Sequence, residues 1–302
     1  MEQTKTTEKP KPTEPLAKGQ TIAGNQFARM WHSFKKRKVA VLGLIIVITY
    51  IVLAIIAPAI APYDPIKQDL GNMLQPPGGE HILGTDELGR DILSRLLYGA
   101  RISIRVGFVA IAVGFMVGAP LGMIAGYTGG KVDMLIMRTM DIMMAFPGML
   151  LAIMFVSILG PSLNNAVLAV GINTVPGFAR LARGETLSIR ENEFIEAAKA
   201  LGASNIRIVF NHVLMNIISP MIVMCTTEFG NTIIATAALG FLGIGAQPPT
   251  PEWGAMLSNG RQFLMLAPHV TTMPGLVMMV LVLGLNLMGD GLRDVLDPKL
   301  KD

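Results

Sequence analysis

Long apolar stretches separated by short polar segments dominate the chain after its first 38 residues. The first stretch, Val39–Ala61, contains no charged residue, and as a helix it would be about 34 Å long, enough to cross a hydrocarbon core of about 30 Å. Five more stretches have a similar character: Ser103–Gly126, Ile142–Gly160, Asn165–Leu181, Ile217–Gly245 and Thr271–Gly289. The pattern therefore predicts an all-α, polytopic membrane protein with six transmembrane helices.

The composition supports this prediction. Hydrophobic residues make up 51% of the 302 residues and charged residues 15%, whereas about a quarter of the residues of a soluble domain are charged. The single cysteine, Cys225, lies in an apolar stretch, so the chain can form no internal disulfide. No basic patch with interleaved aromatic residues follows the basic N-terminal region, so the sequence predicts no nucleic-acid partner.

Lysine and arginine residues set the expected orientation, because they concentrate on the cytoplasmic side of a membrane. With the N-terminus inside, the predicted cytoplasmic segments hold 19 of the 25 basic residues. These segments include an N-terminal tail, residues 1–38, whose first half has a disordered composition, and a C-terminal tail, residues 293–302. The sequence thus predicts a multi-pass protein with both termini in the cytoplasm.

The predicted outer side also carries basic residues, so the charge bias across the membrane is incomplete. Residues 62–102 form a predicted extracytoplasmic segment with an interfacial helix before the second span, and the membrane core follows as residues 103–292. Six basic residues fall on this side or at the adjoining span ends: Lys67, Arg90, Arg95, Arg101, Arg105 and Arg261. Acidic residues at positions 86, 87 and 91 offset part of this charge.

A polar interruption between the fourth and fifth spans, residues 190–216, has its own pattern. Apolar residues recur at helical spacing in two short repeats, Phe194, Ala197, Ala198, Leu201 and then Ile206, Val209, Phe210, Val213. Gly202 lies between the repeats, where a left-handed residue ends a helix. The pattern predicts two short amphipathic helices. It is compatible with a hairpin on the membrane surface or with a docking surface, and the small alanine pair favours docking.

The stretch EAAKALGASNIRIVFNHVLMN (Glu196–Asn216) resembles the EAA loop of ABC importer permeases. Three other stretches resemble the C-type permease subunits of dipeptide, oligopeptide and nickel importers: LGTDELGRDILSRLLYGARISI (Leu83–Ile104), GFLGIGAQPPTPEWGAML (Gly240–Leu257) and NLMGDGLRDVLDPKL (Asn286–Leu300). The resemblance covers the chain after about residue 30. It implies a type I ABC importer permease fold and an ATP-driven importer for peptides, in which this chain forms half of the translocation pathway.

The resemblance also implies residue roles in the loop. Glu196 would contact a partner ATPase, Ala197 and Ala198 would let that partner approach closely, and Gly202 would make the turn. Phe194 and Leu201 would belong to the same coupling surface. The proline that usually follows the conserved leucine of this family is absent, and Met215 stands in its place.

The partners implied by the resemblance are a second, B-type permease in a heterodimer, two cytoplasmic ATP-binding subunits, an external substrate-binding protein and membrane lipid. The location implied is a bacterial or archaeal plasma membrane. The segment GYTGGKV (Gly126–Val132) lacks the glycine at 125 and the Ser or Thr at 132 that a phosphate-binding loop needs. We therefore expect this chain to bind no cofactor, and ATP and Mg²⁺ to be used by the partner ATPases.

No catalytic residue or metal ligand is predicted, because the four histidines lie far apart in the sequence and no nucleophile or zinc motif is present. One charge needs a separate explanation. Glu228 lies within the fifth span, where a charge costs about 2.5–3.5 kcal/mol, and Asn231 shares its helix face. A polar contact between helices and a lining of the translocation path both remain open.

Three other functions can be compared with the same sequence features. A permease for nickel or another small solute fits the same motifs. An ion-driven secondary transporter should show an inverted repeat and paired ionisable residues within the membrane, which the sequence lacks. An intramembrane enzyme would need a nucleophile with a base or a metal cluster, and neither is evident.

Overall fold

The computed structural model of the protein describes residues 31–296, and its regular structure is helical apart from two isolated backbone bridges between residues 78 and 91. The all-α prediction is confirmed. The predictions for the first half of the N-terminal tail and for the last six residues lie outside the described residues. The elements are α2 (Lys38–Ile60), η1 (Leu70–Asn72), α3 (Ile92–Thr128), α4 (Gly130–Ala145), α5 (Gly148–Leu159), α6 (Leu163–Arg190), α7 (Glu193–Ala200), α8 (Asn205–Ile208), η2 (Val209–Val213), α9 (Leu214–Phe241), α10 (Trp253–Gly260), η3 (Arg261–Phe263) and α11 (His269–Leu296).

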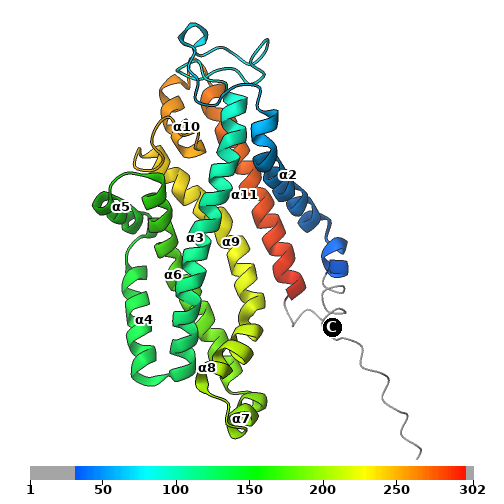
Figure 1. The fold of residues 1–302 in the computed structure, drawn as a ribbon, viewed down its shortest axis with the longest axis vertical. Coiled ribbons are helices and arrows are strands. Elements are labelled where there is room, and N and C mark those ends of the chain that lie inside the picture. The colour runs from blue at the N-terminus through cyan, green and yellow to red at the C-terminus, as the bar shows by residue number, and fades with distance from the viewer. Residues whose placement is uncertain (1–30, 297–302) are drawn as a thin grey trace, which may run out of the picture.

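The long helices run along the long axis of the molecule, with α10 at one end and α7 and α8 at the other (Figure 1). Four helical segments are long and apolar enough to cross a membrane: α2, α3, residues 205–241 and α11. The bent pair of α4 and α5 adds a fifth if it counts as one span. The count of six therefore stays a prediction, because α6, which contains the expected fourth span, carries several charged residues and does not reach the same apolar character.

The predicted third span, Ile142–Gly160, contains a break between two helices. Helix α4 ends at Ala145 and α5 begins at Gly148, and the two helices meet at 93°. Pro147 favours a break at this position, because the ring of a proline disfavours the helical conformation of the residue before it. Phe146 accordingly has φ −90° and ψ 138°, in the extended region.

The helix expected before Ser103 is the first part of α3 and leads into the second predicted span without a break. Helix α3 is continuous over 37 residues from Ile92 to Thr128. Asp91 caps its start, with a carboxylate oxygen that accepts a hydrogen bond from the Ser94 backbone N–H at 2.7 Å. The predicted boundary between the outer segment and the membrane core thus falls inside one helix.

Glycines allow α3 to pack directly on the backbone of α6, which is the most extensive helix contact within the described chain. Four of them recur at every fourth position of α3 and face α6: Gly114, Gly118, Gly122 and Gly126. A Cβ atom at Gly118 would lie 2.5 Å from the Val175 carbonyl oxygen. Small residues at this spacing let helices approach closely in a membrane, where apolar burial alone drives little association.

The segment from residue 62 to residue 91 covers the α10 end of the helices and is held by buried charge. The Arg90 Nε lies 2.7 Å from an Asp86 carboxylate oxygen, and the Arg95 Nε lies 3.3 Å from the same oxygen. Trp253, at the start of α10, is fully buried and donates a hydrogen bond from its Nε1 to the Leu96 carbonyl oxygen at 3.2 Å. This outer cap, residues 62–91, is therefore fixed to the first turns of α3.

The glycine contact gives a direct test of the fold. We expect Gly118→Ala to lower the apparent unfolding temperature of the purified protein, because the new methyl group would overlap carbonyl oxygen on α6, which cannot rotate away. The matched control is Gly184→Ala, since Gly184 is a helical glycine with nothing within 4 Å of an added Cβ. Thermal unfolding in detergent would measure both variants. Equal stability of the two would contradict the assigned packing.

Candidate functional site

The loop of residues 190–216 forms the end of the molecule opposite α10 (Figure 1). Its first turn leaves α6 at Arg190 and enters α7 at Glu193. Asn192 occupies the position before α7, but its side-chain amide donates back to the carbonyl oxygens of Ser188 and Ile189, at 3.3 and 3.1 Å. Asn192 thereby closes the end of α6 and leaves the start of α7 without a side-chain cap.

Gly202 makes the turn between α7 and α8, as the sequence predicts. Its φ is +81°, a conformation that residues with a side chain rarely adopt. The Ala203 N–H donates to the Ala198 carbonyl oxygen at 3.0 Å, and the Gly202 N–H donates to the Lys199 carbonyl oxygen at 2.9 Å. This pair of bonds is the Schellman arrangement that ends a helix on a glycine.

The apolar residues of the loop point in two directions. Ile195, Ile208 and Val213 are fully buried in a cluster with residues of α3, α6 and α9, and Ala198 packs against that cluster. Ala197 is exposed. The expected single face of the first helix is therefore divided, because Ala198 faces its own chain and Ala197 faces away from it.

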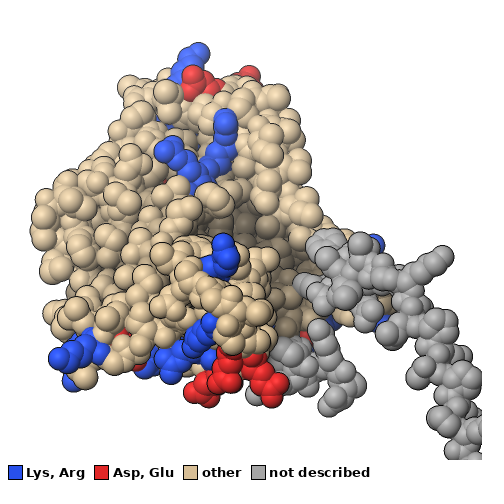
Figure 2. Space-filling view, turned by 60° about the horizontal axis from the view of Figure 1, so that its bottom comes forward, with Lys and Arg blue, Asp and Glu red and all other residues tan. Residues whose placement is uncertain are grey.

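The outward side of the loop is apolar and uncovered by the rest of the described chain. Leu201 is 88% exposed, and the neighbouring exposed apolar side chains are Phe194, Ile206 and Phe210. We call these four residues the exposed apolar surface of the loop. Figure 2 shows charged side chains gathered at this end of the molecule, whereas most of the remaining visible face is uncharged.

The ends of α3 and α6 hold the loop in place. The Tyr127 hydroxyl donates to the Asn205 side-chain oxygen at 3.0 Å, and the Lys199 ammonium lies 5.6 Å from the centre of the Tyr127 ring. The Arg190 guanidinium donates to the carbonyl oxygens of Gly126 and Tyr127, at 3.3 and 3.2 Å. No local pattern in the sequence marked Tyr127, because its partner Asn205 lies 78 residues away.

Glu196 is exposed at the edge of a recess of about 700 Å³ formed by the same residues. No ion pair among residues 31–296 includes Glu196. Its carboxylate is thus solvent-exposed on the side of α7 that faces this recess. All six residues that the sequence assigned to coupling lie between Phe194 and Gly202. Of these, Ala198 faces inward.

Glu228 and Asn231 lie in α9, away from this loop. The Asn231 side-chain amide donates to a Glu228 carboxylate oxygen at 3.4 Å, so the two residues share a helix face as predicted. This is the only hydrogen bond of the Glu228 side chain within the described part of the chain, and it joins residues of the same helix. Within residues 31–296, Glu228 therefore forms no hydrogen bond to another helix.

Comparison with known proteins gives two matching family models. Residues 118–302 match the family described as binding-protein-dependent transport system inner membrane component. Residues 25–77 match the N-terminal transmembrane domain of oligopeptide transport permease C.

Curated relatives match nearly the whole chain. The dipeptide transport system permease protein DppC of Alkalihalophilus pseudofirmus is 50% identical over 292 residues, which are 97% of this chain and 96% of that protein. DppC of Haemophilus influenzae is 47% identical and covers 90% of this chain and 94% of its own length. The glutathione transport system permease protein GsiD of Pectobacterium atrosepticum is 44% identical and covers 96% of both chains.

A solved structure shares the fold. A chain of the MetNI methionine ABC transporter, in an inward-facing conformation, superposes with a TM-score of 0.56 at 21% identity, over 68% of this chain and 97% of that chain. The similarity supports the predicted ABC importer permease fold.

Gly202 provides a test of the loop geometry that does not depend on any partner. We expect Gly202→Val to speed amide hydrogen exchange across α7 by about tenfold or more, because a β-branched residue at positive φ costs about 1–2 kcal/mol. Gly202→Asn is the control, since asparagine tolerates this conformation better than other residues with side chains. Exchange would be measured by mass spectrometry on the purified chain, and identical exchange in the two variants would contradict the strained turn.

Proposed function

The chain belongs to the family of binding-protein-dependent transport system inner membrane components, and we propose that it is the permease subunit of an importer that carries peptides of two or three residues. It is a multi-pass inner-membrane permease of the ABC peptide importer family. The observation that carries the substrate proposal is the end-to-end similarity to permeases named for dipeptide and glutathione transport.

The loop of residues 190–216 is proposed to couple this permease to a cytoplasmic ATPase. Its exposed apolar surface supports this role, because a large apolar side chain left in water forgoes about 1.5–3 kcal/mol of burial. Ala197 leaves room for a partner to approach, and the Glu196 carboxylate offers a charged contact beside it. A hairpin immersed in lipid would leave this carboxylate in an unfavourable environment.

The packing of the loop supports a mechanical link between the ATPase and the membrane helices. Ile195 is buried against α3, α6 and α9, and Tyr127 at the end of α3 is hydrogen-bonded to Asn205. A displacement of α7 is therefore passed to three long helices at once. Binding of ATP by the partner ATPases would close them, move the docked loops and shift the pathway between inward-open and outward-open states.

The proposed assembly contains this chain, a B-type permease, two ATP-binding subunits that use ATP and Mg²⁺, and an external substrate-binding protein. The α7 end lies in the cytoplasm with both termini, in a bacterial or archaeal plasma membrane. Glu228 and Asn231 are proposed to face the pathway or the second permease, because the only side-chain hydrogen bond of Glu228 among residues 31–296 joins it to Asn231 of the same helix.

Peptide import and coupling can be tested together in proteoliposomes that contain the four proposed subunits and the binding protein. We expect uptake of radiolabelled Ala-Phe that requires ATP. Leu201→Arg should reduce both uptake and co-purification of the ATPases by about tenfold, because it places a charge in the centre of the proposed contact. Met265→Arg is the control, since Met265 is 97% exposed at the opposite end. Normal ATPase binding by Leu201→Arg would refute the docking role.

The proposed orientation predicts one-sided labelling. In a Cys225→Ala background, Asn211→Cys in the loop should react with an impermeant thiol reagent only from the cytoplasm, and Met265→Cys only from outside. Both positions are exposed. Labelling would be measured in right-side-out and inside-out vesicles. Reaction of both cysteines from the same side would show that the proposed topology is wrong.

A further inference from the structure

Two arginines of α3 have no partner for their charge within the described chain. Of the four arginines between residues 90 and 105, Arg90 and Arg95 form ion pairs with Asp86. Arg101 and Arg105 are exposed, and no ion pair or side-chain hydrogen bond among residues 31–296 includes them. They lie one helical turn apart, so they project from the same face of α3.

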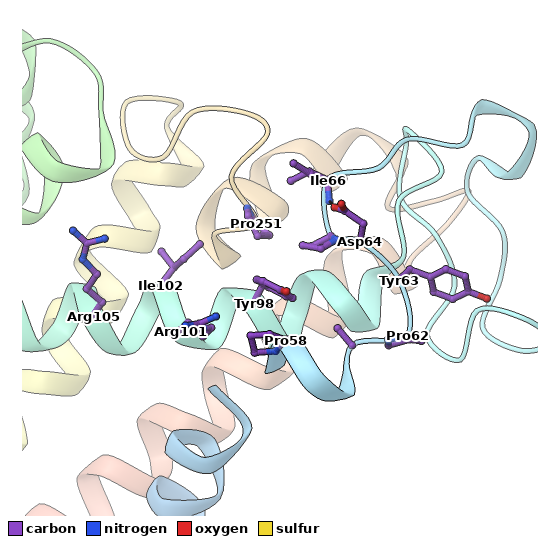
Figure 3. Close-up of a pocket in the computed structure, with 12 residues that line it drawn as sticks. Pro58, Pro62, Tyr63, Asp64, Ile66, Tyr98, Arg101, Ile102, Arg105 and Pro251 are labelled. Atoms are coloured by element: carbon purple, nitrogen blue, oxygen red, sulfur yellow. Dashed lines mark hydrogen bonds between the residues drawn. The ribbon is translucent and has the colours of Figure 1, made fainter. Parts of the chain in front are cut away.

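Both arginines line a cavity of about 900 Å³ near the α10 end of the molecule. Its walls come from the last residues of α2, the start of the outer cap, the first turns of α3 and Pro251 (Figure 3). Its volume lies within the range of about 300–1,000 Å³ typical of small-molecule sites. The cavity is therefore large enough for a short peptide.

The same two arginines also line a second cavity, of about 870 Å³, whose other walls are nearly all apolar side chains of α2, α3, α9 and α11. Arg101 and Arg105 thus stand where an outer, more polar cavity meets an inner, apolar one. Figure 2 shows Lys and Arg side chains beside a hollow in an otherwise largely uncharged face.

The outer cavity also carries a negative charge on another wall. Asp64, in the chain segment that follows α2, lines the cavity, and one of its carboxylate oxygens accepts a hydrogen bond from the Ile66 N–H at 2.8 Å. No ion pair joins Asp64 to either arginine. Figure 3 shows Asp64 on the outer segment, and Arg101 and Arg105 on the helix.

Unpaired guanidinium groups at the edge of an apolar cavity favour an anion that can accept hydrogen bonds from both. A carboxylate suits this geometry, because its two oxygens accept paired hydrogen bonds from guanidinium groups. A dipeptide carries a carboxylate at one end and an ammonium group at the other, and its chain extends about 7 Å at most. The two kinds of charge on the cavity walls match these two ends.

We propose that Arg101 and Arg105 bind the free α-carboxylate of a peptide that enters the pathway, and that Asp64 binds its α-amino group. The inference rests on the proposed peptide import and names a recognition site on the permease itself. Two other anions would fit the arginines alone, an acidic side chain of the partner permease and the phosphate of a lipid, and the test separates them.

The test measures equilibrium binding to the permease–ATPase complex in nanodiscs, without the binding protein. The probes are Ala-Phe, its C-terminal amide and its N-acetyl form. We expect wild type to bind Ala-Phe about tenfold more tightly than either blocked form, which corresponds to about 1.4 kcal/mol. The double variant Arg101→Gln/Arg105→Gln should lose the preference over the amide and keep the preference over the acetyl form.

Asp64→Asn should give the opposite pattern and lose only the preference over the N-acetyl peptide. Arg261→Gln is the control, because Arg261 is an exposed arginine predicted on the same side that lines neither cavity. It should bind all three probes as wild type does. These reciprocal losses distinguish recognition of the two peptide ends from a general loss of structure.

Equal affinity of wild type for Ala-Phe and its amide would overturn the proposal. Loss of the partner permease from the double arginine variant would also overturn it, since the arginines would then hold that subunit. Displacement of the peptide by phosphatidylglycerol, with loss of this lipid from the double variant, would assign the arginines to lipid instead. Uptake in proteoliposomes separates the proposed recognition site from the proposed peptide import. Import without an end-group preference would refute only the site, and an end-group preference without import would refute only the transport function.

Discussion

Direct contact between the backbones of α3 and α6 is the constraint on which the rest of the structure depends. Glycines at every fourth position of α3 bring the two helices together, and carbonyl oxygens of α6 occupy the space where side chains would otherwise be. Within a membrane, water provides no strong force that drives helices together, so this shape match supplies much of the association. The loop at one end and the outer cap at the other both attach to α3, and their relative position follows from this contact.

Much of the fold follows from local sequence patterns. The apolar stretches predict the long helices because spanning a membrane leaves few alternatives to a helix. Gly202 predicts the turn of the loop because few residues adopt its conformation. Pro147 also carries a local signal for a bend in the third predicted span, but only the structure shows that two helices meet there at 93°. The sequence does not clearly mark α6 as a membrane span. One face of this helix packs against α3, and its other side carries charged residues.

The details of the candidate sites depend on contacts between distant residues, which one sequence does not reveal. Helical periodicity placed both alanines of the loop on one surface, yet only packing against α3, α6 and α9 decides that Ala198 turns inward. The hydrogen bond between Tyr127 and Asn205 joins the end of α3 to the start of α8. Neither residue's local sequence indicates which distant residue is its partner. Among the outer arginines, the sequence showed an excess of positive charge, whereas the structure shows which guanidinium groups pair with Asp86 and Glu87 and which remain unpaired among the described residues.

The unbroken length of α3 restricts how this chain can change in evolution. A single residue inserted between Arg105 and Gly114 would rotate everything before it by about 100° relative to everything after it, because each residue advances a helix by that angle. The arginines would then leave the cavity wall while the glycines kept their contact with α6, and a compensating deletion would have to fall within the same few turns. Related permeases that keep both features are therefore expected to keep this interval at constant length, and to vary in length in the outer cap and the tails.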